Sequence, residues 1–489
     1  MSKGRPSLPI HTAAWLKEHR NMTLLIASAR KGPFGPSQRT LNSTPTATVA
    51  VKRSVRGRAL ALPLLLAALA AGPVAADEVT KWSELASQIA LNSGLADSNP
   101  LFQTRILAMT HAAVHDAVNA VDRRYRSYSS LALSSPGAHP DAAVAAAART
   151  VLLSQFNALI PFGFPSQEPD INTAYSITLA AIPNGTAKTL GIAAGEAAAA
   201  QILTLRAGDG AYQLPLVDLA YPQGTAPGQY RFTAPFNFAF ATKWGTLTPF
   251  ALDDVRRLRP NSPYPINSKR YTDDFDEVKR LGGDGVTTPS ARTEDQTEIA
   301  RFWLESSPIG WNRIARAASA TAGLNLWENA RLFALLNLAL ADGYIASLAA
   351  KYQHNFWRPI TAIHEAETDG NAATAADPAW TPLATTPPIP DHDSAHSVEG
   401  GAAAEVLERF FGDTRFSFRT CSTSLPGGSR CQDPSPVFRS YRSFSEAADE
   451  NGLSRIYVGF HFRYAVSEGI QHGRRIGHWT IEHYLKPSR

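Results

Sequence analysis

The amino-acid sequence predicts an all-α fold in which helices pack as an antiparallel bundle, on three observations. Apolar residues recur at helical spacing in several long segments. Strand-like alternation of apolar and polar residues is not evident, and no repeat of fixed period occurs. After an N-terminal leader about 410 residues remain, which is enough for two packed cores.

The first helical region is rich in Ala and Leu. We expect helices there over residues 101–121, 143–159, 171–182 and 191–205. From residue 208 to about 268 the periodicity stops and Pro, Gly and aromatic residues predominate, which is typical of a long ordered loop or domain connection. The sequence therefore divides into an N-terminal helical half with this loop, residues 77–268, and a C-terminal helical half, residues 269–489.

Helical spacing returns in the C-terminal half. It covers residues 293–305, 326–357, 400–411, 443–452 and 465–484. The segment 326–357 is the most apolar part of the chain after the leader. Asn337 and Asp342 interrupt it, so we expect a core helix and not a membrane span.

The charge of the chain argues against a nucleic-acid partner. The chain has 47 Lys and Arg against 42 Asp and Glu, a formal net charge of +5. Residues 1–76 hold 11 of the basic residues and one acid, so residues 77–489 carry 36 basic and 41 acidic side chains, a net charge of −5. We therefore expect no nucleic acid among the partners.

Residues 51–76 have the anatomy of a secretory signal peptide. Basic residues lead into an apolar run over residues 59–71, and Val74-Ala75-Ala76 forms a small-residue cleavage site. The apolar run is too short to span a membrane comfortably. We expect cleavage before Asp77, no stable membrane span afterwards, and export to the periplasm or the exterior. Residues 1–50 are then a disordered extension or the result of a misassigned translation start.

Cys421 and Cys431 are the two cysteines, and they flank a Ser-, Pro- and Gly-rich stretch. In an exported protein they most simply form one disulfide that closes a surface loop. Two cysteines alone cannot make a structural zinc site.

Three segments of the last third carry cations, imidazoles and a hydroxyl that could enclose one tetrahedral oxyanion. In the first, Lys351 and Arg358 are seven residues apart, about two helical turns, and would share nearly one face of a helix. Pro359 disfavours helix at Arg358, so the guanidinium would project from the helix end and offer a bidentate contact. Alone, this spacing is more often that of a solvated helix face.

The second segment follows a stiff, Pro-rich stretch of the chain. Asp393 or Ser394 should cap the Ala-rich helix that follows, so Ser394 and the Ala395 amide could bind an oxyanion at its N-terminus. His396, in the first turn, would point at the same anion and could exchange a proton near neutral pH. A capped surface helix with an incidental histidine is the alternative.

The third segment contains Arg455 and His461. Six residues apart, they would lie on different faces of one helix and converge only if the chain breaks between them, for which Gly459 is a plausible position. A capping box at Ser443 begins a helix that we expect to end near residue 452. Arg455 and His461 would then lie on the connection to the next helix.

In order and spacing the three segments resemble the signature of the vanadium-dependent haloperoxidases, which are related to the acid phosphatases of the type 2 phosphatidic acid phosphatase superfamily. That signature is Lys-x6-Arg-Pro, Pro-Ser-Gly-His and Ser-Arg-x5-His. Residues 109–120 and 355–363 also look like the exported bacterial type, and the resemblance covers about residues 82–484. It implies two four-helix-bundle-like halves joined by long Pro/Gly-rich loops.

The resemblance implies vanadate as cofactor, with His461 as the metal ligand and His396 as the acid-base group, both of them catalytic. Electrostatic preorganisation by the cations would do most of the work. The cofactor-binding residues implied by the match are Lys351, Arg358, Ser394, Ala395, Arg455 and His461.

The same resemblance implies hydrogen peroxide and halide as partners, with a hypohalous acid-type halogenating species as product. It is compatible with an organic acceptor and with a homodimer, and no motif fixes the halide. Two alternatives stay open. An acid phosphatase would use His461 as nucleophile and His396 to protonate the leaving oxygen. In the second alternative the protein binds an oxyanion but no longer catalyses a reaction.

Three positions depart from the family pattern: Ala395 replaces Gly, Asp393 replaces Pro, and Ala465 replaces an Asp that often follows the apical histidine by four residues. Ala keeps the amide N–H but resists positive φ. Asp393, as a helix cap, would point away from the anion. Loss of the Asp leaves the orientation of His461 without a predicted partner.

Three further histidines have less specific surroundings. His111 and His115, one helical turn apart and next to Asp116, could share a metal ion, but they fit the filling of a helix interface better because no third ligand is evident. We expect His392 to face solvent.

Overall fold

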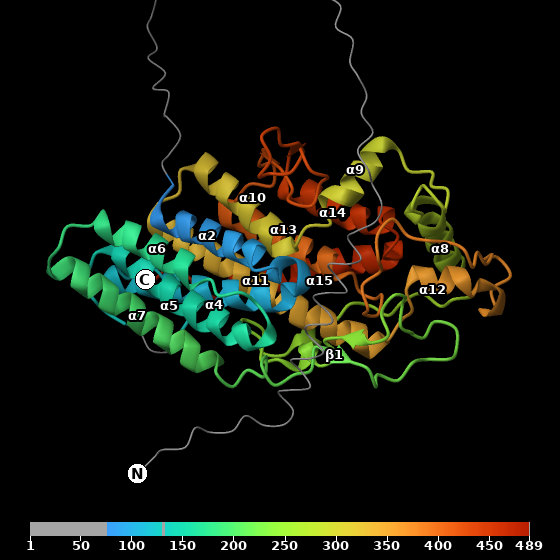
Figure 1. Ribbon diagram of the computed structural model, residues 1–489, viewed down its shortest axis with the longest axis horizontal. Coiled ribbons are helices and arrows are strands. Elements are labelled where there is room, and N and C mark those ends of the chain that lie inside the picture. Colours follow the sequence, from blue (N-terminus) through green and yellow to red (C-terminus); the bar gives the residue numbers. More distant parts are fainter. Residues whose placement is uncertain (1–75, 130–132, 489) are drawn as a thin grey trace, which may run out of the picture.

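The computed structural model describes residues 76–129 and 133–488, in which helices run side by side and long loops join them (Figure 1). The predicted signal peptide, apart from Ala76, and the extension before it lie outside these residues. The described N-terminal part contains α2 (Glu78–Asn92), α3 (Leu95–Ser98), α4 (Pro100–Val121), α5 (Pro140–Leu159), α6 (Glu168–Ala180) and α7 (Thr186–Arg206). Helices α4 to α7 confirm the four predicted ones.

The C-terminal part holds the remaining helices. They are α8 (Lys269–Gly282), α9 (Glu294–Phe302), α10 (Ser307–Ala322), α11 (Leu326–His354), α12 (Pro359–His364), α13 (Ala395–Phe411), α14 (Phe444–Tyr457) and α15 (Arg463–His483). Helices α2, α8, α10 and α12 were not predicted. Helix α8, for example, has mostly charged residues and buries a narrow apolar stripe that includes Phe275 and Val278.

The long connection between α7 and α8 is ordered but mostly irregular, as predicted. It contains β1 (Val217–Asp218), β2 (Ala239–Phe240) and the short turns η2 (Trp244–Thr246) and η3 (Val255–Leu258). β1 pairs antiparallel with β2, with Val217 opposite Phe240. A second small sheet joins β3 (Phe418–Thr420) to β4 (Arg439–Tyr441). Two further turns, η1 (Ile160–Phe162) and η4 (Ala366–Thr368), complete the regular structure described.

Helix α11 runs through the centre of the molecule and packs against both α4 and α13 (Figure 1). A capping box between Asn325 and Glu328 begins it, and Asn355 ends it in the left-handed conformation, at φ 49°. By length and composition α11 could cross a membrane, as could the helical stretch Pro140–Phe162, but 94% of its apolar window is buried inside the protein. This burial fits the core helix that the sequence predicts.

One apolar core runs through the helices on both sides of residue 268. It includes side chains of α4, α5, α11 and α13. The proposed division into two halves at that residue therefore stays a prediction.

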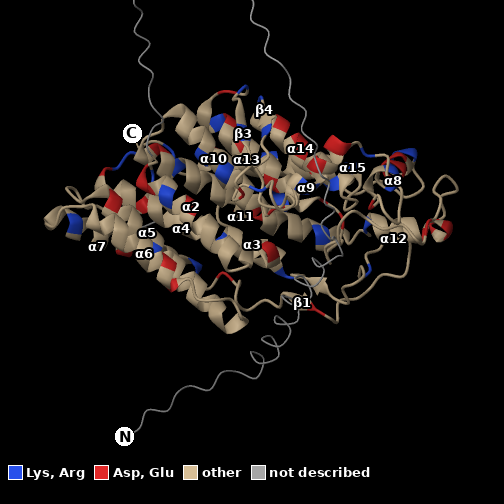
Figure 2. Ribbon diagram, turned by 45° about the horizontal axis from the view of Figure 1, so that its top comes forward, with Lys and Arg blue, Asp and Glu red and all other residues tan. Residues whose placement is uncertain are grey.

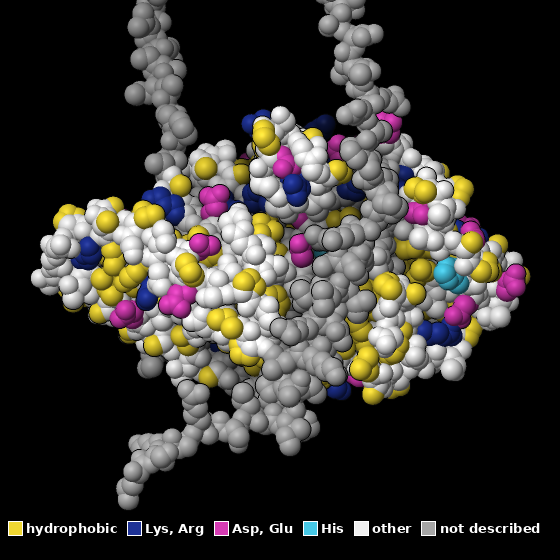
Figure 3. Space-filling model, viewed as in Figure 1, with side chains coloured by type: hydrophobic (Ala, Val, Ile, Leu, Met, Phe, Trp, Pro, Cys, Tyr) yellow, Lys and Arg dark blue, Asp and Glu magenta, His cyan; other side chains and the backbone are white. Residues whose placement is uncertain are grey.

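The surface mixes side chains of all kinds. Acidic and basic side chains are interspersed over the helices (Figure 2), and apolar side chains lie singly or in small groups among polar ones (Figure 3). The more exposed large apolar side chains include Ile177 on α6 and Leu205 on α7, at 67% and 56%. Single exposed residues of this kind are normal on a protein surface, so the predicted homodimer stays a prediction.

Asp342, in the middle of α11, fastens the long connection to the core. Its side chain is fully buried and accepts backbone N–H bonds from Phe250, Ala251 and Leu252 at 2.6, 2.7 and 2.7 Å. Burial raises the pKa of this carboxyl to about 6, even though the three N–H donors oppose the shift. Without these bonds three buried amides would lose their acceptor.

We predict that Asp342→Ala lowers the free energy of unfolding by about 3 kcal/mol, because three buried amides lose a charged acceptor. Urea unfolding followed by circular dichroism measures the change. Asp253→Ala is the matched control, since Asp253 lies in the same connection, exposed and ion-paired with Arg257. Its removal should cost at most about 0.5 kcal/mol. Equal losses in the two variants would contradict the anchoring role of Asp342.

Candidate oxyanion site

The structure brings the predicted site residues together where several helices end. Lys351 lies in the last turn of α11, Arg358 immediately precedes α12, and Ser394 precedes α13, whose first two residues are Ala395 and His396. Arg455 lies in the last turn of α14, and His461 lies in the loop between α14 and α15. All are buried except His396, which is half-buried.

The electrostatics of His461 show that these groups share one space. Burial holds the pKa of His461 well below its ordinary value, and Arg358, Lys351, Arg455 and His396 lower it further, in that order. His461 is therefore neutral near pH 7. Arg358 Nη1 donates to His461 Nε2 at 3.0 Å and to the Phe460 carbonyl at 3.0 Å.

Arg358 reaches the site by a different route from the one predicted. Helix α11 ends at His354, four residues before Arg358, so Lys351 and Arg358 do not lie on one helix. Trp357 N donates to the carbonyl of Gly228, and Arg358 adopts the extended conformation usual before proline, with ψ 155°. Pro359 then starts α12. The guanidinium of Arg358 therefore lies at the start of α12 and not at the end of α11.

Lys351 is held by the chain that precedes α13. Its Nζ donates to the carbonyls of Pro390 and Asp391, at 2.9 Å each. Burial, followed by the charge of Arg358, lowers the pKa of Lys351 to about 7, while Asp393 and Asp391 act in the opposite direction. The ammonium thus loses its proton in the physiological pH range when no anion is bound.

The start of α13 keeps hydrogen-bond donors available. Ser394 occupies the N-cap position, but its side chain makes no capping bond and instead accepts from Ser397 Oγ at 2.9 Å. The hydroxyl proton of Ser394 is therefore free to donate to a ligand, together with the amides of the first turn. Ala395 is not among the residues with positive φ, so the change from Gly causes no backbone strain.

The loop that carries His461 begins one turn later than predicted. Helix α14 continues to Tyr457, so Arg455 lies within the helix, and its Nη2 donates to the Trp303 carbonyl at 2.7 Å. Continued packing of the helix explains the difference, since Ile456 and Tyr457 are both buried. Gly459 breaks the chain as predicted, with φ 83°, and a Cβ there would lie 2.7 Å from the Gly282 carbonyl. His461 can thus turn back towards Arg455.

Asp391 orients His461, and the sequence interpretation missed it. Its Oδ1 accepts from His461 Nδ1 at 2.8 Å, so the proton of the neutral ring lies on Nδ1 and the lone pair on Nε2. Burial raises the pKa of Asp391 to about 7, although Arg358 and Lys351 oppose the shift. In the family pattern a carboxylate often follows the apical histidine by four residues, where this chain has Ala465. Here the carboxylate that contacts His461 lies 70 residues earlier in the chain. The one sequence signal for it is that Asp391 is an acidic residue next to the expected oxyanion-binding segment.

Asp393 does not cap α13 and does not point to solvent. It is fully buried, accepts from Ser347 Oγ at 2.7 Å and pairs with His472 Nδ1 at 2.7 Å. Burial acts to raise the pKa of Asp393, but the interaction with His472 holds that pKa below its ordinary value. Asp393 thus ties the segment before Ser394 to both α11 and α15.

The prediction that His392 faces solvent is wrong. The side chain is 1% exposed, and its Nε2 lies 2.7 Å from the carbonyl of Asn261 in the long connection. It stacks on Tyr464 at 5.7 Å between ring centres. Folding of the connection over this segment covers His392, which a reading of local sequence could not foresee.

His396 points towards the segment that joins α9 to α10. Its Nε2 lies 3.3 Å from the Glu305 carbonyl, and burial together with Arg455 holds its pKa well below the ordinary value. Glu305 in turn accepts from Thr423 N at 3.0 Å and pairs with Arg313. The orientation of His396 therefore depends on the loop that contains Thr423.

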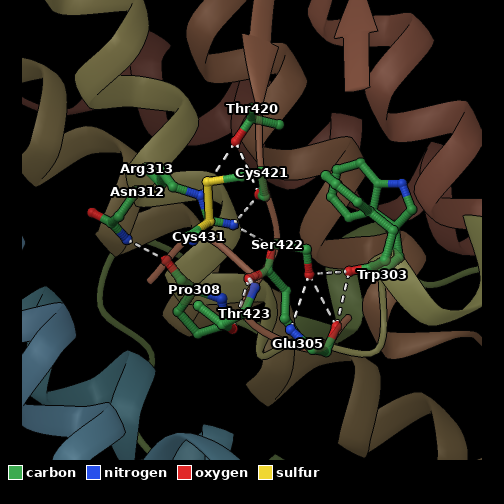
Figure 4. A network of polar contacts seen from close by, with 12 residues as sticks. Trp303, Glu305, Pro308, Asn312, Arg313, Thr420, Cys421, Ser422, Thr423 and Cys431 are labelled. Carbon is green, nitrogen blue, oxygen red and sulfur yellow. Dashed lines mark hydrogen bonds and ion pairs between the residues drawn. A yellow bond between two sulfur atoms is a disulfide. The ribbon is translucent and has the colours of Figure 1, made fainter. Parts of the chain in front are cut away.

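The predicted disulfide between Cys421 and Cys431 is confirmed, with a Cα–Cα distance of 5.2 Å. It closes the loop that contains Thr423, next to Glu305 and Trp303 (Figure 4). Arg313 Nη2 donates to the Cys421 carbonyl at 2.7 Å. The carbonyls of Trp303 and Glu305 face Arg455 and His396, so the disulfide loop supports the wall of the oxyanion site.

His111 and His115 are fully buried on α4, away from this site. His111 stacks on Phe333 of α11, and its pKa is lowered to about 3 by burial and by Arg316. His115 Nδ1 lies 3.0 Å from Asp116. Within residues 76–129 and 133–488 no group of three His, Cys, Asp or Glu side chains could hold a metal ion.

Comparison with known proteins shows which known fold this chain has. A family model described as the VCPO second helical-bundle domain matches residues 331–488. Among solved structures, the first bacterial vanadium-dependent iodoperoxidase superposes with a TM-score of 0.68 and 24% identity, over 84% of this chain and 98% of that chain. The chain has the fold of the vanadium-dependent haloperoxidases.

Two further relatives agree. The holo-type bacterial vanadium-dependent chloroperoxidase superposes with a TM-score of 0.63 and 16% identity, over 82% of this chain and 95% of that chain. Vanadium chloroperoxidase of Curvularia inaequalis is 24% identical over 301 residues, which are 51% of this chain and 48% of that protein. The match thus spans about half the length of this curated relative.

The residues of this haloperoxidase-like site fit a vanadate ion. Arg358 Nη2 is buried and has no hydrogen-bond partner, so a donor is left for a ligand oxygen. Lys351, Arg358 and Arg455 are buried, and within the described chain none of them forms a salt bridge. Three buried cations and a free hydroxyl donor suit a tetrahedral oxyanion. His461 Nε2 supplies the nitrogen that a vanadium centre would bind.

Phosphate, which has the shape and charge of vanadate, should bind more weakly as the pH rises. Because Lys351 titrates at about 7 in the free protein, its neutral form must gain a proton on binding above that pH. The ratio of wild-type to Lys351→Met affinity should then fall roughly tenfold per pH unit above neutrality. Titration calorimetry measures the two affinities. Because the protonation state of phosphate changes with pH in the same way for both proteins, its effect cancels in their ratio. Lys269→Met, at an exposed lysine, is the control, and a ratio independent of pH would contradict the role of Lys351.

Asp391→Ala should weaken vanadate binding about 10- to 100-fold, because His461 loses the partner that fixes its ring. Asp391→Asn keeps an acceptor oxygen and should bind within a few-fold of wild type. Calorimetry gives the affinities, and the ¹⁵N chemical shifts of His461 report which ring nitrogen carries the proton. Unchanged affinity and an unchanged tautomer in Asp391→Ala would show that Asp391 does not orient the ring.

Proposed function

We propose that the protein is a vanadate-dependent haloperoxidase that oxidises halide with hydrogen peroxide to a hypohalous acid-type halogenating species. The observation that carries this proposal is the convergence on His461 of Arg358, Lys351, Arg455 and His396. The relatives named above are vanadium chloroperoxidases and an iodoperoxidase. Vanadate, when bound, supplies a Lewis-acidic centre that activates peroxide for attack by halide.

The side chains of this chain divide the work. His461 offers Nε2 to vanadium because Asp391 accepts its Nδ1 proton. Lys351, Arg358 and Arg455 balance the charge on the vanadate oxygens. These cations are fixed before the reaction begins, so little reorganisation is needed as charge moves.

Two donors and one base complete the site at the start of α13. Ser394 Oγ and the Ala395 amide would donate to the oxygens of a bound vanadate. His396 is neutral near pH 7 because burial and Arg455 lower its pKa, so it can accept a proton from peroxide. The hydrogen bond to the Glu305 carbonyl sets the direction of its ring.

Several finer features of the proposal rest on sequence and surface alone. We propose that the protein is exported, because of the leader over residues 51–76 and the disulfide. A homodimer and an organic acceptor of the oxidised halogen are further parts of this proposal.

Reconstitution tests the proposed function. The protein is stripped of anions, supplied with orthovanadate and assayed for peroxide-dependent oxidation of bromide and iodide. We expect activity only with vanadate and inhibition by phosphate. Arg358→Ala should lower kcat about 100-fold or more, whereas Arg256→Ala, at an exposed arginine, should leave it unchanged. Absence of vanadate-dependent oxidation with either halide would overturn the proposal, and phosphomonoester hydrolysis without vanadate would favour a phosphatase.

A further inference from the structure

Glu399 is a buried carboxyl group for which the mechanism above has no role. It lies on α13, one turn after His396, and is 0% exposed. Neither of its carboxylate oxygens has a hydrogen-bond partner. A buried carboxylate without partners is very costly in free energy, so such a group is expected to hold a proton or to contact water.

The carboxyl group of Glu399 lies against α11 in the core. A Cβ added at Gly343 of α11 would lie 2.7 Å from Glu399 Oε1, so the glycine makes room for the carboxyl group. The next residue, Tyr344, is buried, and its hydroxyl lies near Ser307 but makes no hydrogen bond of ordinary geometry. Its hydroxyl interacts electrostatically with both Glu399 and Arg455. Tyr344 is thus coupled electrostatically both to Glu399 and to one cation of the oxyanion site.

A second buried polar side chain lies beside the same turn of α13 and is bonded to His396. Asn451 of α14 lies beside Gly400, where an added Cβ would be 3.0 Å from Asn451 Nδ2. Asn451 Nδ2 donates to the His396 carbonyl at 3.1 Å, while its Oδ1 is buried without a partner. Unpartnered buried oxygens at Glu399, Tyr344 and Asn451 are the setting in which internal water binds.

The charge around Glu399 favours its neutral form. Burial alone raises the pKa of this carboxyl well above the ordinary value. On α11, Tyr344 interacts electrostatically with Glu399, and Tyr344 also interacts with Arg455 of α14. On α15, His472 is paired with Asp393. Glu399 therefore keeps its proton at a pH at which His396 does not.

The proposed reaction needs such a proton. Hydrogen peroxide, a halide ion and one proton give hypohalous acid and water. The O–O bond breaks, the halide is oxidised by two electrons, and the distal oxygen leaves as water. One proton is consumed in each turnover, and it must reach a buried site.

We propose that Glu399 is the internal proton store of this site, passing its proton through Tyr344 and bound water to the oxyanion cradle and taking one back from solvent. This inference rests on the proposed function. The carboxyl group acts through its neighbours and does not touch the substrate. Glu399→Gln keeps the size and the neutral charge of the side chain but cannot give up a proton.

The first test is infrared difference spectroscopy of the vanadate-free protein near neutral pH. Wild type minus Glu399→Gln should show the C=O band of a protonated carboxylic acid. Inorganic phosphate, as a stand-in anion, should shift that band in the wild type. The matched control is Glu405→Gln, on the same helix but ion-paired with Arg474 at 3.2 Å, which should keep the band. A missing band or no shift with phosphate would overturn the proton store, whether or not the protein oxidises halide.

The second test is the pH profile of halide oxidation by the vanadate-loaded enzyme. Glu399→Gln should be slowed about 10-fold or more near neutral pH, with the ratio to wild type growing as the pH rises, because protons must then come from solvent. Vanadate affinity and thermal stability should stay close to wild type. Parallel pH profiles would overturn the inference. If the wild type is inactive, the proposed function is refuted. The infrared experiment then decides by itself whether Glu399 stores a proton.

Discussion

The burial of three cations at one point, with no salt bridge to any of them within the described residues, is the constraint on which the rest of the structure depends. Burial lowers the pKa of Lys351, Arg358 and Arg455, and the charge of Arg358 lowers the pKa of Lys351 and of Arg455 further. Such a cluster is unfavourable until an anion enters it. The core and the loops around it must therefore hold the cations in place.

Two carboxylates on the segment before α13 reduce this repulsion without closing the site. Asp391 lies against His461 and Asp393 against His472, so each acts on the cations at a distance and leaves their donors free. Asp393 also connects the segment to α11 and α15, and Asp391 connects it to the loop that carries His461. Binding of an oxyanion and correct packing of these helix ends are thus coupled.

The sequence predicts well what depends on local pattern. The apolar periodicity of α4 and α11, the break at Gly459 and the pairing of Cys421 with Cys431 need only nearby residues. It predicts poorly what depends on distant contacts. His392 is buried because residue 261 folds over it, and His461 is oriented by a carboxylate 70 residues away. Helix α8 was not predicted because most of its residues are charged and its apolar stripe is narrow.

The most direct test of this account is a crystal structure of the protein loaded with vanadate, with vanadium located by its anomalous scattering. The account predicts vanadium within bonding distance of His461 Nε2, with Asp391 still accepting from Nδ1 and Arg358 turned from the imidazole to a vanadate oxygen. Vanadium bound elsewhere, or an oxyanion in the cradle with Arg358 still on His461 Nε2, would contradict it.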